Sequence, residues 1–393
     1  MAEGRPAVIF QDPGFELPEL PADVEALRSE ARAFLDDELK AGGFEPVCNA
    51  WMDGYAPEFS RKLARRGWIA MTWPKQYGGH ERSAFENFVV NEELLAAGAP
   101  VAAHWAGVRQ TGPLFMRYGN DSIKDLFLHR MARAELFFAI GMSEPDAGSD
   151  LAQVRTRARR CEGGWVINGR KIWSSGAHRA DYMVVFCRTG TDADGDRRAG
   201  FSQLIVDLKA PGITIRPIYM MSGAHHFNET NFDDVFDPED RLIGKPGEGW
   251  SQVVSELGYE RSGPERFMST FPVLIGLVRM AAADCDSRRV VALGQLTARL
   301  WTLRRMSIAL LTLLAKGQSP EVEAALVKDL GTCFERDTVE IVRGLVPTRR
   351  ADGPASEFDV LLAKCLLAAP AFTLRGGTNE ILRNVIARSL GLR

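Results

Sequence analysis

The chain has 393 residues, of which 46% are hydrophobic and 25% charged, and its formal net charge is −3 at pH 7. This length predicts two or three packed units. The small net charge argues against general attraction to nucleic acid or to anionic lipid. No stretch has the apolar length of a membrane span, and the acidic, proline-broken start lacks the pattern of a secretory signal, so we expect a cytoplasmic protein.

Six cysteines are scattered along the chain, with no C-x-x-C pair and no histidine spacing typical of zinc. We therefore expect reduced thiols and no metal site. The cysteines are Cys48, Cys161, Cys187, Cys285, Cys333 and Cys365.

The first part of the chain has a helical pattern. Apolar residues recur at helical spacing from Val24 to Leu35, and Asp23 is the expected N-cap of this helix. Glycine and proline separate the later periodic segments. Further helices are predicted over residues 57–67, 84–97, 107–118 and 122–133. We expect residues 1–136 to form an N-terminal helical domain.

From about Leu136 the pattern changes to short β segments such as DYMVVFCRT and FSQLIVDL. Turn signals lie at residues 162–164, at Asn168-Gly169 and at residues 192–196. No helices intervene and no G-x-G-x-x-G is present, which excludes a parallel dinucleotide-binding sheet. We expect residues 137–249 to form an antiparallel β-barrel or sandwich.

From about Gly249 the chain returns to long helical segments with apolar stripes on more than one side. Such helices are typical of a bundle that also packs against other subunits. We expect residues 250–393 to form a four-helix-bundle domain, and the whole chain to be an α+β multidomain protein.

Three stretches have distinctive chemistry. They are GMSEPDAGSD (141–150), KIWSSGAHRADYMVV (171–185) and GGTNEILRNVIAR (376–388). The first follows a predicted strand, so its backbone N–H groups and the hydroxyls of Ser143 and Ser149 can face an acceptor-rich planar ring or a phosphate. The second sets an indole beside two hydroxyls. Taken separately, an ordinary polar loop and a core tryptophan are the alternatives.

In this order, the three stretches resemble the acyl-CoA dehydrogenase family of FAD flavoproteins, and PKQYGG (74–79) and HFNETNFDDVFDPEDRLIGKPGEGW (226–250) resemble its linking segments. The resemblance implies FAD as cofactor, an acyl-CoA substrate and an electron-transfer flavoprotein as electron acceptor. It also implies that Met142 and Ser143 bond the pyrimidine side of the flavin ring, that Trp173 packs against the ring, and that Ser175 bonds near its N5.

The resemblance assigns three further residues. Ser149 occupies a position that contacts the pantetheine or the CoA phosphate region and lies close to the cofactor. Thr378 and Glu380 occupy positions that contact FAD, often from a subunit interface.

The family reaction removes an α-proton from the thioester while a β-hydride passes to the flavin, which requires a positioned carboxylate base. Many members carry that base immediately before Gly-Thr, where this chain has Gly376. Another branch of the family carries a glutamate followed by arginine early in the third domain, and LGYERSGPERF places Glu260 and Arg261 there.

We therefore interpret Glu260 as the base, with Arg261 on the substrate. Gly376 then donates its backbone N–H to the thioester oxygen, and Gly377 lets the backbone approach the ligand closely. One alternative is that Glu260 is a surface glutamate paired with an arginine. Another is that Glu265 is the base, because Gly263-Pro264 could bend the helix toward it.

The motifs that hold the adenosine end of FAD in the family are weak here. The corresponding segments are DSRRVVALGQL and EIVRGLVPTRRADGP, in which Arg288 or Arg289 either reaches a phosphate or lies on the surface. A steroid side-chain subclass of the family divides its cofactor contacts between two chains. We therefore expect either a homotetramer or dimer, or a heterotetramer with a paralogous subunit. A mainly structural subunit and a related flavin oxidase are the competing functions.

Overall fold

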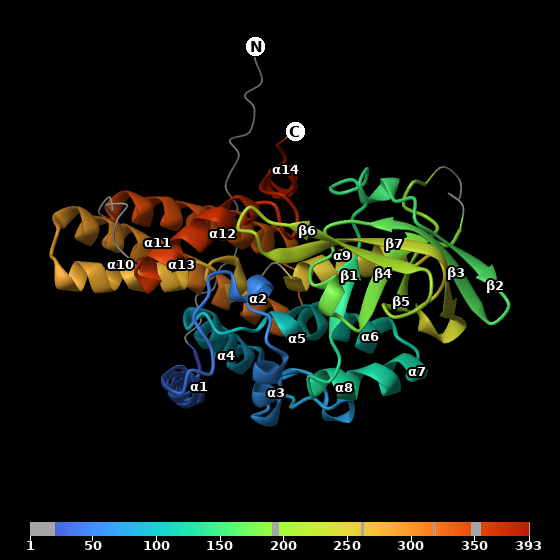
Figure 1. Ribbon diagram of the computed structural model, residues 1–393, viewed down its shortest axis with the longest axis horizontal. Coiled ribbons are helices and arrows are strands. Elements are labelled where there is room, and N and C mark those ends of the chain that lie inside the picture. Colours follow the sequence, from blue (N-terminus) through green and yellow to red (C-terminus); the bar gives the residue numbers. More distant parts are fainter. Residues whose placement is uncertain are drawn as a thin grey trace, which may run out of the picture.

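The computed structural model describes residues 20–190, 196–260, 263–316, 318, 320–346 and 355–392, with the side chains of 256–260 outside that description. The chain forms a helical part, a β part and a second helical part, in that order (Figure 1). The predicted fold class is confirmed. We retain 1–136, 137–249 and 250–393 as proposed domain ranges.

The first helical part runs from Leu20 to Ala132, and its helices agree with the predicted segments. Helix α4 begins with a capping box in which Ser83 and Glu86 exchange side-chain and backbone hydrogen bonds. The prediction that Asp23 caps α1 was wrong, because the helix already begins at Ala22 and Pro21 precedes it. The helices are α1 (Ala22–Lys40), α2 (Ala50–Asp53), α3 (Pro57–Arg65), α4 (Ala84–Ala96), α5 (Ala102–Ala106), α6 (Gly112–Tyr118), α7 (Asp121–Ile123) and α8 (His129–Ala132).

The β part is one eight-stranded sheet in the order β6-β7-β3-β2-β4-β5-β8, with β1 also paired to β4. Its pairings are antiparallel except those of β1 with β4 and of β2 with β4. The strands are β1 (Phe138–Gly141), β2 (Arg157–Cys161), β3 (Gly164–Lys171), β4 (Tyr182–Arg188), β5 (Phe201–Asp207), β6 (Ile213–Tyr219), β7 (His225–Pro238) and β8 (Leu242–Ile243).

Asn168-Gly169 is not a turn between strands, as we had predicted, but lies inside β3. The register of β3 against β7 shifts between Ile167 and Gly169, which marks a bulge. Gly169 has a φ of +148°, and a Cβ there would lie 2.4 Å from the Thr156 hydroxyl. The sequence signal therefore reported a backbone that needs glycine, but in a bulge instead of a hairpin.

The second helical part contains a bundle of four long helices, α10 to α13, with α9 before it and α14 after it (Figure 1). Among the described residues, no helix is long and apolar enough to cross a membrane. The helices are α9 (Gly249–Glu260), α10 (Phe271–Ala283), α11 (Ser287–Ala315), α12 (Glu321–Leu345), α13 (Glu357–Ala368) and α14 (Asn379–Ser389).

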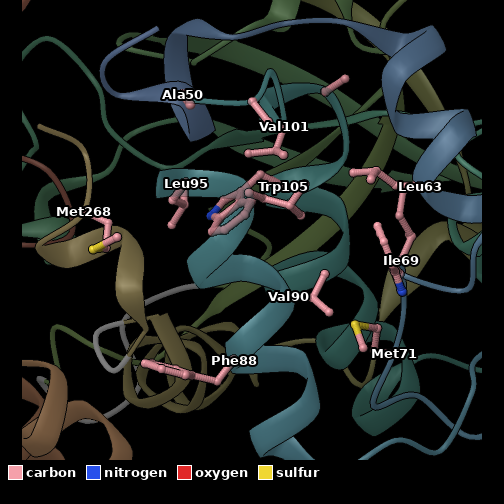
Figure 2. Close-up of a cluster of buried hydrophobic side chains, with 14 of the residues drawn as sticks. Ala50, Leu63, Ile69, Met71, Phe88, Val90, Leu95, Val101, Trp105 and Met268 are labelled. Carbon is pink, nitrogen blue, oxygen red and sulfur yellow. The ribbon is translucent and has the colours of Figure 1, made fainter. Parts of the chain in front are cut away.

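The two helical parts share one core. A single cluster of buried apolar side chains extends from Val24 of α1 to Phe372, just before α14. Figure 2 shows Met268, from the segment before α10, beside Leu95 and Trp105 of the first helical part. The sheet has a separate core between its own strands and loops. The helical parts are therefore held together by burial of apolar surface, which positions residues of the first part beside the C-terminal motif.

We expect Phe88→Ala to lower the free energy of unfolding by about 3–5 kcal/mol, because the ring is removed from a packed core and leaves a cavity. Phe88 is 2% exposed in the shared core (Figure 2). Phe236→Ala is the matched control, since that ring is 51% exposed. Urea unfolding of both variants measures the difference, and equal losses would contradict the shared core.

Candidate active site

A buried ion pair between Lys171 and Glu144 holds the loop that follows β1. Lys171, at the end of β3, donates from Nζ to the Met142 carbonyl at 3.0 Å and to the Glu144 carboxylate at 2.8 Å. Glu144 also accepts from the backbone N–H groups of Arg155 and Thr156 at 2.7 and 2.9 Å. The Lys171 side chain is fully buried. The two carboxylate oxygens and the ammonium thus fix the loop to the sheet.

The charges of this pair depend on each other. Burial opposes the charge on Glu144, but Lys171 and the N–H donors outweigh it, so the pKa of Glu144 lies below its ordinary value. Burial lowers the pKa of Lys171, and Glu144 opposes that change. Removing either partner would leave a buried charge without compensation.

This anchoring turns the loop carbonyls inward. The Met142 carbonyl faces Lys171, and the Ser143 carbonyl accepts from the Ile172 N–H at 2.9 Å. Within the described part of the chain, the N–H groups of Met142 and Ser143 have no hydrogen-bond acceptor. The loop therefore offers two adjacent donors to a ligand with acceptor atoms.

The next part of the site is the turn after β3. Trp173 has a φ of +61°, unusual for a bulky residue, and its indole is 55% exposed, with an edge-on contact to Phe227. Asn228 holds the turn: its carbonyl accepts from the Ser174 N–H at 3.1 Å, and its amide donates to the Ser174 carbonyl at 2.9 Å. A strained backbone that presents a flat apolar ring is typical of a ligand clamp.

Ser175, in the same turn, contacts His226 of β7. The Ser175 Oγ lies 3.1 Å from His226 Nε2, and His226 Nδ1 lies 3.6 Å from a carboxylate oxygen of Asp53 in α2. Asp53 accepts a 2.8 Å hydrogen bond from the Asn49 amide. Residues of the first helical part thus reach the turn that carries Trp173 and Ser175.

Before α14, the chain makes a turn with two left-handed glycines. Gly376 and Gly377 have φ values of +66° and +85°, which side chains rarely adopt. Lys328 of α12 donates to the Gly377 carbonyl at 2.6 Å and to the Asn379 side chain at 2.7 Å. Among the residues described, no acceptor faces the Gly376 N–H. In this turn, as in the loop after β1, a backbone carbonyl accepts from a buried lysine and a nearby backbone N–H has no acceptor among the described residues.

Arg375 anchors this turn to both helical parts. It donates to the Ser269 hydroxyl at 2.8 Å, to Glu335 of α12 at 2.7 Å and to the Asn49 side-chain carbonyl. Its guanidinium also lies 4.5 Å from the ring centre of Trp51. Burial raises the pKa of Glu335 and lowers that of Arg375, so each charge depends on its partner.

The remaining residues of the C-terminal motif begin α14. Thr378 is its N-cap and accepts from the Ile381 N–H at 3.4 Å. Glu380 is exposed, and the pKa of its carboxylate is lowered by its own backbone amide and by the Thr378 hydroxyl. Ser149 is exposed in the turn between β1 and β2. The predicted ligand roles of Ser149, Thr378 and Glu380 stay predictions.

Helix α9 ends at Glu260, whose side chain lies outside the described residues, as does Arg261. Glu265 follows in a short 3-10 segment, Pro264–Arg266, and is 1% exposed. Its carboxylate accepts from Arg109 at 2.7 Å. Glu265 is thus part of the joint between the two helical parts.

The two arginines considered for the adenosine end have partners on their own chain. Arg288 pairs with Asp286 at 2.8 Å, and Arg289 pairs with Asp284 at 3.3 Å. Arg288 is exposed, as the surface alternative expects, whereas Arg289 is buried and also donates to the Leu345 carbonyl at 3.5 Å.

Sequence reasoning missed six residues that build the site: Glu144, Lys171, Asn49, Asp53, His226 and Arg375. Glu144, Lys171 and His226 stand inside the quoted motifs and Arg375 immediately precedes one, so buried charge could have been suspected there. Asn49 and Asp53 lie in a segment with no distinctive pattern, so only the tertiary structure identifies them.

Comparison with known families gives two matches. The Acyl-CoA dehydrogenase N-terminal domain matches residues 21–135, and the Acyl-CoA dehydrogenase middle domain matches residues 139–235. Acyl-CoA dehydrogenase IpdE1 of Mycobacterium tuberculosis is 34% identical, over 94% of this chain and 98% of that protein. Acyl-CoA dehydrogenase FadE26 of the same organism is 32% identical, over 84% and 86%.

Two solved structures are similar over nearly the whole chain. The steroid ACAD Tcur3481-Tcur3483 superposes with a TM-score of 0.86 at 28% identity, covering 96% of this chain and 99% of that one. The ChsE4-ChsE5 complex from Mycobacterium tuberculosis superposes with a TM-score of 0.80 at 29% identity, covering 95% and 99%.

We expect Lys171→Met to lower the free energy of unfolding by about 3–5 kcal/mol, because Glu144 would stay buried without its cation. Lys209→Met is the matched control, since Lys209 is 79% exposed and pairs with Asp181 at 3.6 Å. That variant should lose about 0–1 kcal/mol. Urea unfolding at neutral pH tests both, and a Lys171 variant as stable as the Lys209 variant would contradict the anchoring role.

Proposed function

This chain belongs to the acyl-CoA dehydrogenase family and is an FAD-dependent oxidoreductase, and from that premise we propose how its residues act. The proposed reaction removes hydrogen from the Cα–Cβ bond of an acyl-CoA thioester and gives the trans-2-enoyl-CoA. Glu260 is the proposed α-proton base. The observation that carries this proposal is the Gly376-Gly377 turn, because it has no side chain to act as a base and both its φ values favour glycine.

The residues of the β part fit the flavin end of FAD. The isoalloxazine ring is planar and rich in acceptor atoms, which suits the two uncommitted amides of Met142 and Ser143. The exposed indole of Trp173 offers a flat apolar surface, and Ser175 adds a hydroxyl beside it. Bound there, FAD supplies the acceptor for the hydride that leaves the β-carbon.

The proposed base and oxyanion donor come from the C-terminal part. Glu260 stands at the end of α9 and would take the α-proton on its carboxylate. The charge that develops on the thioester oxygen needs a hydrogen-bond donor. We assign that role to the Gly376 N–H, because it has no hydrogen-bond acceptor among the described residues. Arg261 and Gly377 are assigned to substrate binding.

Glu265 is a weaker candidate for the base. Its carboxylate is engaged by Arg109 at 2.7 Å and is buried at the joint between the helical parts. Using it as a base would require that pair to open. This supports Glu260 as the base of the proposed mechanism.

The names of the similar structures suggest the substrate class. One is called a steroid ACAD and shares 28% of its residues with this chain. A glycine pair in place of a larger catalytic side chain leaves room beside the α-carbon. We therefore propose a bulky, steroid-derived acyl-CoA as substrate, with an electron-transfer flavoprotein as the acceptor of the electrons.

We propose a paralogous subunit as partner, as the two-name complexes above suggest. The chain has a shallow, open, largely apolar surface on one face of α11. Two of its residues, Trp301 and Val290, are 61% and 45% exposed, which suits a subunit interface. Its lining residues are Val290, Leu293, Gly294, Thr297, Ala298, Trp301 and Thr302. The partner would also supply the adenosine contacts that Arg288 and Arg289 do not offer.

Glu260→Gln should slow flavin reduction by acyl-CoA about 10²–10⁴-fold, the usual contribution of a general base. Glu265→Gln is the matched control and should keep most of the rate in protein that still folds. The measurement is anaerobic mixing of the FAD-loaded protein with straight-chain and steroid side-chain acyl-CoA thioesters. A Glu260→Gln rate equal to that of the unchanged protein would refute the base.

Trp301→Glu should reduce the size of the assembly, because a charge would be buried in the interface at α11. Multi-angle light scattering of the co-purified proteins measures the mass, and FAD per chain is counted in the same sample. Tyr219→Glu, at a 66% exposed site on β6, is the control. A chain that forms a homotetramer with full FAD by itself would exclude the paralogous partner.

A further inference from the structure

Asn49 and Asp53 of the first helical part link Arg375, beside the glycine turn, to His226 and Ser175 of the β part. Arg375, next to the glycine turn, donates to Asn49, and Asn49 donates to Asp53 at 2.8 Å. Asp53 lies 3.6 Å from His226, which contacts Ser175 at 3.1 Å. None of these contacts follows from the proposed roles of Glu260 and Gly376.

His226 is placed to act on one hydroxyl. Its side chain is about nine-tenths buried, and Phe227 packs edge-on against the ring at 4.6 Å. Each ring nitrogen faces one polar group: Nδ1 faces Asp53, and Nε2 faces Ser175. The ring therefore has no freedom to exchange partners without breaking the packing.

The surroundings keep His226 neutral at neutral pH. Burial lowers its pKa to about 4, with further lowering by the charges of Arg179, Arg375 and His225. Burial raises the pKa of Asp53, while Asn49 and Arg375 oppose that rise. A neutral imidazole carries one N–H. The negative charge of the Asp53 carboxylate, which faces Nδ1, favours the tautomer with the proton on Nδ1.

We propose that His226 is a positioning residue that orients the Ser175 hydroxyl. With the proton on Nδ1, Nε2 is an acceptor, so Ser175 donates its O–H to His226. The Ser175 oxygen then keeps its lone pairs for the ligand. This inference rests on the proposed position of Ser175 beside the flavin N5.

The direction of the hydroxyl has a predictable consequence. Flavin N5 is an acceptor when the ring is oxidised and carries an N–H when it is reduced. A Ser175 oxygen that can only accept a hydrogen bond is complementary to the N5–H of the reduced ring. Loss of His226 would free the hydroxyl to donate to the oxidised ring, which shifts the equilibrium toward the oxidised form and lowers the midpoint potential.

The test is a redox titration of the FAD-loaded full chain, with its partner subunit if they co-purify, and it needs no acyl-CoA. His226→Phe should shift the oxidised-to-reduced equilibrium at least tenfold, which for a two-electron couple is a fall of about 30 mV. His226→Gln can still offer an acceptor and should shift it less. His80→Phe, at an exposed histidine, should leave it unchanged.

Asp53→Asn tests the middle of the link. An amide has one carbonyl oxygen, so it cannot accept from Asn49 and face the His226 N–H at the same time. The midpoint potential should fall, but less than in His226→Phe. Thermal denaturation of each variant checks that it is folded, and FAD affinity is measured alongside.

Ser175→Ala distinguishes a failure of the proposed flavin position of Ser175 from a failure of the proposed role of His226. If Ser175→Ala changes the potential while His226→Phe and His226→Gln leave it unchanged, the role of His226 is wrong and the flavin position of Ser175 stands. If Ser175→Ala also leaves it unchanged, the flavin position is wrong and the role of His226 falls with it.

Discussion

The position of the glycine turn in this site depends on the hydrogen bonds that the buried guanidinium of Arg375 donates. Arg375 joins Glu335 of the bundle to Asn49 of the first helical part, one residue before the glycine turn. A guanidinium presents its donors in a fixed plane, so three acceptors from different elements set the position of the turn closely. Because the helical parts share one apolar core, these acceptors are held at fixed distances.

The site repeats one physical device. A buried lysine takes a loop carbonyl inward, at Met142 through Lys171 and at Gly377 through Lys328. Near these two carbonyls, the N–H groups of Met142, Ser143 and Gly376 have no acceptor among the described residues. Fixed backbone donors need no reorganisation when charge develops on a ligand, which is the property that electrostatic catalysis requires.

Motif order was enough to predict the family, the fold class and FAD as cofactor, since each motif carries residues whose chemistry is legible in the sequence. The local errors have physical causes. Asn168-Gly169 is a turn signal, but the pairing of β3 with β7 absorbs it as a bulge. Asp23 has the residue type of an N-cap, but the helix begins at Ala22 with Pro21 in the N-cap position. Such choices depend on neighbouring strands and turns, which a local pattern does not contain.

The sequence alone determined the family and singled out the residues to which we assign chemistry: Gly376 at the usual position of the base, Glu260, and the indole and hydroxyls of KIWSSGAH. It could do so because residue type and order along the chain are local properties. Only the tertiary structure decided how these residues are held. Asn49 and Asp53 lie far from Ser175 and Arg375 in sequence, and burial brings them together. Their role arises from a desolvated network of contacts between elements, and no spacing along the chain encodes that.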